Sequence, residues 1–198
     1  IKMTSQGRWQ RYLKRRNMKV TRQQLLAIVG DGVKTADLLH YINQWADTFG
    51  INTKQRMCHF LAQSLHETNG FKNLTEIGNA AYLYKYDSGK LAKILGNTQK
   101  GDGAKYRGRG LLMTTGRYNY QAYQNSGFCK GDIMKNPSLL ANPLGATKSG
   151  MWWWWKHKCN ELADKDDVVA LREKINGGTN GLDDVKRWLE KCKKELMK

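Results

Sequence analysis

Two glutamates that lie nine residues apart are the strongest candidates for acid–base chemistry in this sequence. Glu67 follows Phe60 by seven residues, about two helical turns, so the two side chains share one face of a predicted helix. Asn69 and Gly70 both tolerate the left-handed conformation and are predicted to end that helix. Glu76 comes after this break, and we expect the chain to fold back so that Glu76 faces Glu67.

The surroundings predicted for Glu67 favour a group that carries a proton. The helix face that it shares is largely apolar and consists of Met57, Phe60, Leu61, Ser64, Leu65 and Thr68. Desolvation and the negative end of the helix dipole both disfavour a charged carboxylate there. We therefore expect Glu67 to hold a proton near neutral pH and to donate it. A solvated or salt-bridged glutamate is the ordinary alternative, and the residues alone leave it open.

The strong positive charge of the chain predicts an anionic partner. Lysine and arginine number 34 against 17 acidic residues, a net charge of +17, and no acidic residue precedes Asp31. Such a charge suits nucleic acid, a membrane surface or a polyanionic cell wall. The seven tryptophans argue for contacts beyond charge.

Several classes of protein are disfavoured by composition. The sequence has no run of about 18 apolar residues, so no membrane span is expected. Residues 1–6 lack the apolar core of a secretory signal, so we expect synthesis in the cytoplasm. The four cysteines are far apart, which predicts buried free thiols, and with four scattered histidines we expect no metal site and no cofactor. Residues 101–110 are rich in glycine but lack a phosphate-loop pattern, so no nucleotide site is expected.

Helix-capping patterns predict three helices in the first third of the chain. Thr21 and Gln24 form a capping-box pattern, and Thr35 and Thr53 are the predicted caps of the next two helices. The second helix is expected to continue through Phe49. Short joints between three such helices indicate an α-helical domain, residues 21–198. Residues 1–20 form a basic arm, either packed on the body as a helix or left as a tail.

Regular patterns are fewer after residue 77 and return toward the C-terminus. Residues 91–95 and 118–124 predict short helices, and residues 111–117 predict an extended segment within a small hairpin. Asn142-Pro143 opens a helix that carries four consecutive tryptophans, residues 152–155. Two or three of these rings are expected in the core; the alternative is that one lines a groove and stacks on a sugar. The final helix places Val185, Trp188, Leu189, Cys192 and Leu196 on one face.

Six separate motifs, in order, resemble glycoside hydrolase family 19. They are residues 60–68 (FLAQSLHET), 95–98 (LGNT), 101–103 (GDG), 106–110 (YRGRG), 115–120 (TGRYNY) and 175–181 (INGGTNG). That family contains plant-type chitinases and phage endolysins that cut peptidoglycan. The resemblance runs from about Thr21 to the last helix. The short spacing of Glu67 and Glu76 is similar to the compact endolysin branch.

The resemblance implies a fold and a catalytic pair. The fold would be mainly α and lysozyme-like (α+β), a helical bundle with at most a small β-hairpin and a catalytic cleft, with residues 21–198 as the catalytic domain. Glu67 would be the general acid and Glu76 the general base that activates water. Family members invert the anomeric centre, which requires carboxyl groups roughly 6.5–9.5 Å apart.

The resemblance also implies residues that contact substrate. Thr115 would hold the water or the substrate, Asn119 and Asn176 would hydrogen-bond the sugar, His66 would steady the site, and Tyr106 and Arg109 would line the cleft. Met113 stands where the family usually has glutamine, so one substrate hydrogen bond is expected to differ. Asp184 is followed by Val185 rather than arginine, so Lys186 or Arg187 would have to substitute.

The function expected from these features is that of a bacteriophage endolysin. It would be a monomeric muramidase-type lysozyme that cleaves bacterial peptidoglycan between N-acetylmuramic acid and N-acetylglucosamine, made in the host cytoplasm and acting on the wall after release. Its net charge suits an anionic wall, and no nucleic-acid partner is expected. A chitinase that cleaves β-1,4-linked N-acetylglucosamine is the first alternative. The second is a non-catalytic cationic protein that binds cell wall or nucleic acid.

Overall fold

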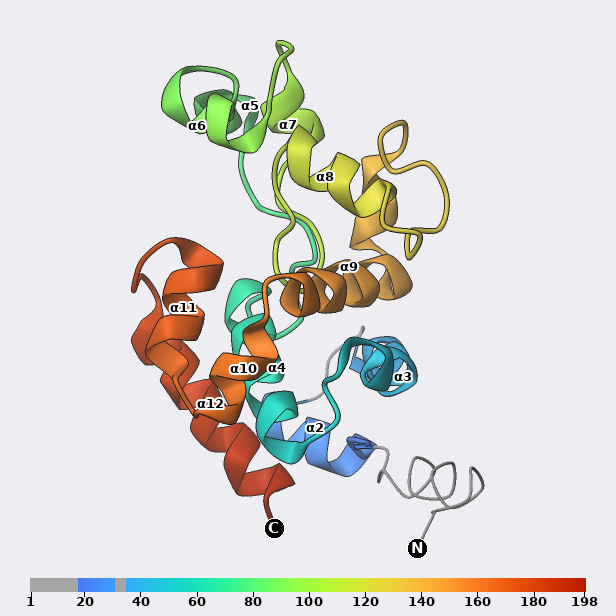
Figure 1. Cartoon of the computed structure of the whole chain (residues 1–198), viewed down its shortest axis with the longest axis vertical. Coiled ribbons are helices and arrows are strands. Elements are labelled where there is room, and N and C mark those ends of the chain that lie inside the picture. The colour runs from blue at the N-terminus through green and yellow to red at the C-terminus, as the bar shows by residue number, and fades with distance from the viewer. Residues whose placement is uncertain (1–17, 31–34) are drawn as a thin grey trace, which may run out of the picture.

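The computed structural model describes residues 18–30 and 35–198, and over these residues the protein is built almost entirely of helices. Figure 1 shows two groups of helices, one above the other, joined by thin stretches of chain. Within the described residues, β pairing is limited to two antiparallel bridges, Thr75 with Arg109 and Arg109 with Thr114. The predicted mainly α class with at most a small hairpin is confirmed. No described helix is long and apolar enough to cross a membrane.

The lower group in Figure 1 forms the larger body. It contains α2 (Arg22–Val29), α3 (Thr35–Trp45), the 3-10 turn η1 (Asp47–Phe49), α4 (Lys54–Glu67), α9 (Pro143–Lys156), α10 (Cys159–Asp164), α11 (Val168–Asn176) and α12 (Leu182–Leu196). The upper group contains α5 (Ala80–Leu83), η2 (Tyr84–Tyr86), α6 (Gly89–Leu95), α7 (Asp102–Lys105) and α8 (Arg117–Gln124). The 3-10 turn η3 (Pro137–Ala141) leads from the upper group into α9.

Side-chain caps start the helices where the sequence predicts them. Thr21 accepts a hydrogen bond from the Gln24 amide at 3.1 Å while its own amide donates to the Gln24 side chain, so the capping box is present. The Thr53 hydroxyl accepts from the third residue of α4 at 3.2 Å, and Asn142 caps α9 with proline at the first helical position. The predicted cap at Thr35 borders residues 31–34, which lie outside the described residues, as do residues 1–17 of the basic arm.

Two predicted elements are wrong in detail. The second helix ends at Trp45 rather than continuing to Phe49, because η1 follows and Gly50 closes it with φ +69°. Residues 110–113 form a turn rather than an extended strand. The reason is burial: Leu111 and its neighbour Leu112 are both buried, and the Leu111 amide donates to the Ala146 carbonyl of α9. The turn tucks this apolar pair into the core.

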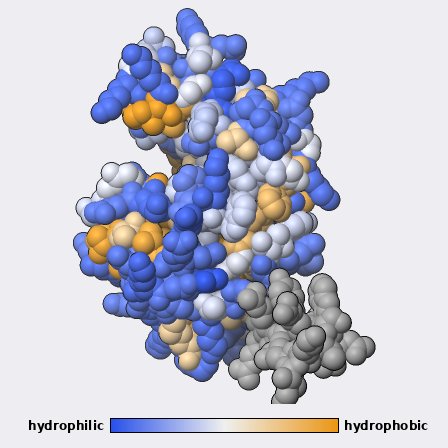
Figure 2. Space-filling view, viewed as in Figure 1, coloured by the Kyte–Doolittle hydropathy of each residue, from blue (hydrophilic) through white to orange (hydrophobic). Residues whose placement is uncertain are grey.

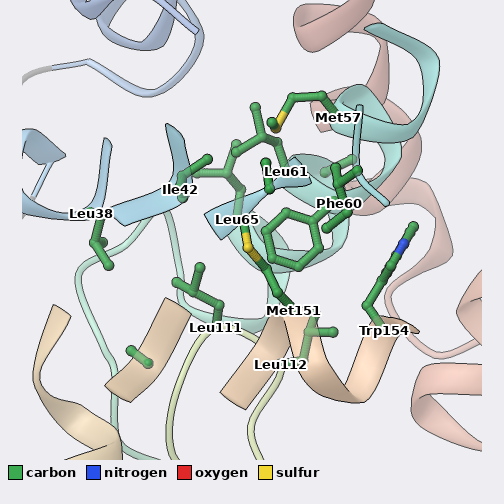
Figure 3. Packing of buried hydrophobic residues seen from close by; sticks show 14 of the residues in the cluster. Leu38, Ile42, Met57, Phe60, Leu61, Leu65, Leu111, Leu112, Met151 and Trp154 are labelled. Carbon is green, nitrogen blue, oxygen red and sulfur yellow. The ribbon is translucent and has the colours of Figure 1, made fainter. Parts of the chain in front are cut away.

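Helix α4 runs through the centre of the body. Every residue from Met57 to Leu65 is buried, so the helix is enclosed on all sides rather than on one face. Figure 3 shows Phe60, Leu61 and Leu65 of α4 meeting Met151 and Trp154 of α9. The rings of Phe60 and Trp154 pack edge to face with centroids 5.5 Å apart. Helix α12 lies along α4 on another side.

The tryptophan run and the cysteines mostly serve the core. Trp152 and Trp154 are buried, Trp153 is partly buried and Trp155 is half exposed, which confirms the expected packing of two or three rings. All four cysteines are free, and all but Cys129 are buried, as the sequence predicts.

Removing the Phe60 ring tests the central position of α4. Phe60 is fully buried against Trp154, so Phe60→Ala leaves a cavity, and we expect the free energy of unfolding to fall by about 3–5 kcal/mol. Urea denaturation followed by circular dichroism measures this change. Ile94→Ala is the control because Ile94 is 62% exposed, and its effect should stay within about 0.5 kcal/mol. Equal effects of the two substitutions would contradict the packing described here.

Candidate active site

A cleft of about 500 Å³ lies between the two groups of helices. Figure 2 shows the surface hollowed at this level. The cleft is lined by Glu67, Asn73, Thr75, Glu76, Ile77, Tyr82, Tyr86, Leu112, Met113, Thr115, Ile175 and Asn176. Both predicted acid–base residues are therefore in one cleft, with three of the predicted substrate-binding residues: Met113, Thr115 and Asn176.

Glu67 is the last residue of α4 and is paired with a buried arginine. Arg172 of α11 donates from Nη1 to Glu67 Oε1 at 2.6 Å, and only 3% of the arginine side chain is exposed. The same guanidinium donates to Gln63 of α4 and to the Asn180 carbonyl. Glu67 is thus not the isolated carboxylate that its apolar helix face suggested. The alternative that the sequence left open, a salt-bridged glutamate, is the one observed.

A sharp backbone turn carries the chain out of α4. The Thr68 hydroxyl donates to the Ser64 carbonyl and accepts from the Phe71 amide, which fixes the helix end. Asn69 and Gly70 have φ of +50° and +67°, as predicted for the helix break, and Phe71 has φ of +65°. Positive φ is strained for phenylalanine, but its side chain is buried in the core, which holds the turn in place.

Glu76 is positioned by backbone pairing. The Gly110 amide donates to the Leu74 carbonyl at 3.0 Å, and the Glu76 amide donates to the Gly108 carbonyl at 2.7 Å. The carboxylate itself accepts two hydrogen bonds, from the Gly108 amide on Oε2 at 3.0 Å and from the Tyr86 hydroxyl on Oε1 at 2.9 Å. Burial and this bond to Glu76 raise the pKa of Tyr86, so the phenol keeps the proton that it donates.

Gly108 lies in a crowded region beside Glu76. A Cβ at this position would lie 3.1 Å from Thr115 Oγ1 and 3.3 Å from both Glu76 Oε2 and Met113 Cβ. The Thr115 hydroxyl donates to the Met113 carbonyl at 2.7 Å. Met113 has φ of +47° because it closes the tight turn between Arg109 and Thr114. The absence of a side chain at Gly108 lets three cleft residues converge.

Asn176 lies on the opposite wall of the cleft, whereas His66 is not among the lining residues. Asn176 ends α11 and lines the cleft, and Gly177 follows it with φ of +76°. His66 points away from the lining and contacts Asp184, with Nδ1 and Oδ2 2.7 Å apart. Burial opposes ionisation of Asp184, but hydrogen bonds from His66 and Arg187 outweigh it and hold the pKa of Asp184 below its usual range. Arg187, one of the two substitutes expected from the sequence, is the residue that pairs with Asp184.

Tyr106, Arg109 and Asn119 do not line the cleft, although the first two were expected to line it and Asn119 was expected to hydrogen-bond the sugar. Tyr106 is buried and donates to the Met134 carbonyl, and Arg109 donates to the Tyr120 hydroxyl. Asn119 donates to the Thr115 carbonyl at 2.8 Å, so it supports a cleft residue from behind. No tryptophan of the described residues lines the cleft either, so the interpretation of a sugar-stacking ring among residues 152–155 is not supported.

Sequence reasoning missed Arg172, Tyr86 and Gly108. Arg172 follows Leu171 on the helix that leads into the Asn-Gly-Gly of the last family motif. An arginine beside an apolar residue on that helix was the signal that could have pointed to a buried arginine. Residues 79–86 contain three tyrosines, but nothing in their pattern singles out Tyr86. Within the described residues, no group of three or more His, Cys, Asp or Glu side chains could hold a metal ion.

Comparison with known proteins decides the family. The family described as chitinase class I, glycoside hydrolase family 19, matches residues 5–174. This chain belongs to family 19. A glycosyl hydrolase family 19 domain-containing protein of Haemophilus influenzae is 35% identical over 170 residues, covering 73% of this chain and 78% of that protein. The chain is thus a glycoside hydrolase.

More distant relatives support the assignment of the fold. An endochitinase of Pisum sativum is 32% identical over 134 residues, which are 65% of this chain but 41% of the length of the pea protein. Chitinase C from Streptomyces griseus HUT6037 superposes with a TM-score of 0.70 at 20% identity, over 90% of this chain and 92% of that one. The similarity to chitinase C confirms the lysozyme-like, mainly α fold of family 19.

Arg172→Met tests the ion pair at the end of α4. The substitution leaves the carboxylate of Glu67 without its partner, and removing one member of a buried pair costs about 3–5 kcal/mol of unfolding free energy. Adding Glu67→Gln to this variant removes the unpaired negative charge. The double variant should therefore regain at least about 1 kcal/mol of unfolding free energy, because an unsatisfied buried polar group costs about 1–3 kcal/mol. Chemical denaturation of the four proteins gives the coupling energy. A coupling near zero would contradict a structural role for the pair.

Tyr86→Phe tests the support of Glu76. It removes one of the two donors to the carboxylate, and a hydrogen bond to a charged group is worth about 1.5–3 kcal/mol, so kcat/KM on a glycan substrate should fall about tenfold or more. Tyr84→Phe is the matched control because Tyr84 is two residues away, 58% exposed and outside the cleft lining. If both variants keep wild-type kcat/KM, Tyr86 does not support catalysis.

Proposed function

We propose that this family 19 enzyme hydrolyses a β-1,4-linked glycan of N-acetylated sugars with inversion, with Glu67 as general acid and Glu76 as general base. The observation that carries the proposal is the unequal support of two carboxylates that line one cleft. Glu67 is held through a single oxygen by a guanidinium. Glu76 is held through both oxygens, by a backbone amide and a phenol.

The support of Glu67 leaves one oxygen for proton transfer. Arg172 engages Oε1, so a proton on Oε2 can pass to the glycosidic oxygen as its bond to the anomeric carbon breaks. The leaving sugar then departs as a neutral hydroxyl. The guanidinium stays in place and neutralises the carboxylate that remains on Glu67.

The support of Glu76 suits the activation of water. A water molecule gives a proton to Glu76 as its oxygen forms the new bond on the opposite face of the sugar. The hydrogen of the Thr115 hydroxyl is engaged by the Met113 carbonyl, so Thr115 Oγ1 is left as an acceptor for that water. Two acceptors, Glu76 and Thr115, would then orient both hydrogens of the nucleophile.

Peptidoglycan is the substrate that we propose first. The net charge of +17 favours association with an anionic wall, which a neutral polymer would not require. Under this proposal the protein is an endolysin that cuts between N-acetylmuramic acid and N-acetylglucosamine, as a monomer acting at the bacterial wall after release from the cell that makes it. Chitin is the second candidate, favoured by relatives that are named endochitinases at 32% identity.

Substitution of the two glutamates tests mechanism and substrate together. Glu67→Gln cannot donate a proton, and Glu76→Gln cannot accept one, so each should lower kcat by at least about 100-fold. The assays are clearing of a purified cell-wall suspension and release of products from soluble chitin oligomers. Glu190→Gln is the control, because this exposed residue of α12 is remote from the cleft lining.

The outcomes separate the candidate functions. Wall clearing that is lost in both cleft variants supports the endolysin, and cleavage of chitin alone supports the chitinase. Wall clearing that persists in Glu67→Gln would instead indicate the non-catalytic cationic binder. Mass spectrometry of the digested wall identifies the new reducing end, and an N-acetylglucosamine end would contradict muramidase-type cleavage.

A further inference from the structure

A second pocket of about 180 Å³ lies between the segment that follows α8 and the start of α9. It shares no lining residue with the cleft and is lined by Tyr123, Cys129, Lys130, Ile133, Leu139, Leu140, Asn142, Leu144, Gly145 and Lys148. Its walls are mainly apolar, yet two of the lining residues are lysines and none is acidic. The function proposed above does not explain this combination of apolar walls and positive charge.

Lys148 supplies the buried positive charge of this pocket. The residue is only 4% exposed, and the described part of the chain contributes no carboxylate within ion-pairing distance of its ammonium group. Its Nζ lies 3.9 Å from the centre of the Trp45 ring. Burial, with the nearby charge of Lys130, lowers the pKa of Lys148. A cation–π contact returns about 0.5–2 kcal/mol, less than the several kcal/mol that burying an ion costs.

The start of α9 adds to the positive potential. Asn142, Leu144 and Gly145 line the pocket and belong to the cap and first turn of this 14-residue helix, where the helix dipole is positive. The exposed Lys130 stands at the same pocket. The nearest acid in this segment, Asp132, already accepts from the Met134 and Lys135 amides. An anion that entered the pocket would therefore meet three positive groups: Lys148, Lys130 and the helix end.

We propose that this pocket binds a small carboxylate with an aliphatic body, the carboxylate on Lys148 and the body against Ile133, Leu139 and Leu140. The apolar walls favour such a ligand over a strongly hydrated inorganic anion, which would lose its water without gaining donors. The volume matches the share of about six water molecules in the liquid, enough for an acid of the size of butyrate. A free acid and the C-terminus of a peptide that ends in a small apolar residue present this same chemistry.

Thermal unfolding of the whole chain tests the site with butyrate as the probe. Butyrate at ten times its dissociation constant should raise Tm by about 3–6 °C, whereas butyramide, which has the same shape without charge, should not. N-acetylalanine serves as the peptide-like probe: a larger shift than butyrate at equal concentration identifies a peptide C-terminus as the source, and a smaller one identifies a free acid. Inorganic phosphate should give no shift beyond that of chloride at equal ionic strength.

Two variants make the result specific to the pocket. Lys148→Met keeps an unbranched side chain, one atom shorter, and removes its charge, so it should abolish the butyrate shift and raise Tm in the absence of ligand. Leu144→Phe narrows the pocket with Lys148 retained and should also lose the shift, which keeps the test informative if Lys148→Met does not fold. Lys135→Met, an exposed lysine outside the lining, should keep the shift. An absent shift in wild type, or one that persists in Lys148→Met or Leu144→Phe, overturns the proposal.

Discussion

The buried guanidinium of Arg172 is the interaction on which the cleft depends. It donates to the Glu67 carboxylate, to the Gln63 side chain and to the Asn180 carbonyl, and so joins α4, α11 and the turn before α12. A buried charge is costly unless its donors find acceptors, and these three acceptors engage three of the five N–H groups of the guanidinium. Because α11 ends four residues later, this anchor also sets where Asn176 enters the cleft. The Arg172 side chain thereby orients Glu67 and fixes the cleft wall that α4 and α11 form.

The other wall of the cleft, which carries Glu76, is held mainly by backbone hydrogen bonds. Glu76 is placed by a short antiparallel ladder and by the Gly108 amide, with Tyr86 as its side-chain donor. Gly108 eases the packing of this ladder because a Cβ at this position would press on Thr115 and Met113. The turn at Met113 follows from the burial of Leu111 and Leu112 beneath α9. The position of Glu76 is therefore set by packing of the same core that surrounds α4.

The sequence predicted the features that depend on neighbouring residues and missed those that depend on distant ones. Helix caps at Thr21 and Thr53 act over three residues, and both were predictable. The pairing of Glu67 with Arg172 joins residues 105 positions apart, so no local pattern could reveal it. The buried environment of Glu67 was foreseen, but the helix face alone could not show that an arginine fills it. The resemblance to the family placed Tyr106 in the cleft, but its ring is buried against Tyr120.

The two carboxylates differ in a way that bears on their roles. Under the proposed mechanism, a guanidinium on one oxygen of Glu67 keeps a positive charge beside the group as it changes protonation state, and leaves the other oxygen free to reach the substrate. Two neutral donors hold the Glu76 carboxylate without placing a positive charge beside it, which would weaken it as the proposed base. The proposed assignment of acid and base therefore rests on the arrangement of donors rather than on the spacing of the two acids in the sequence.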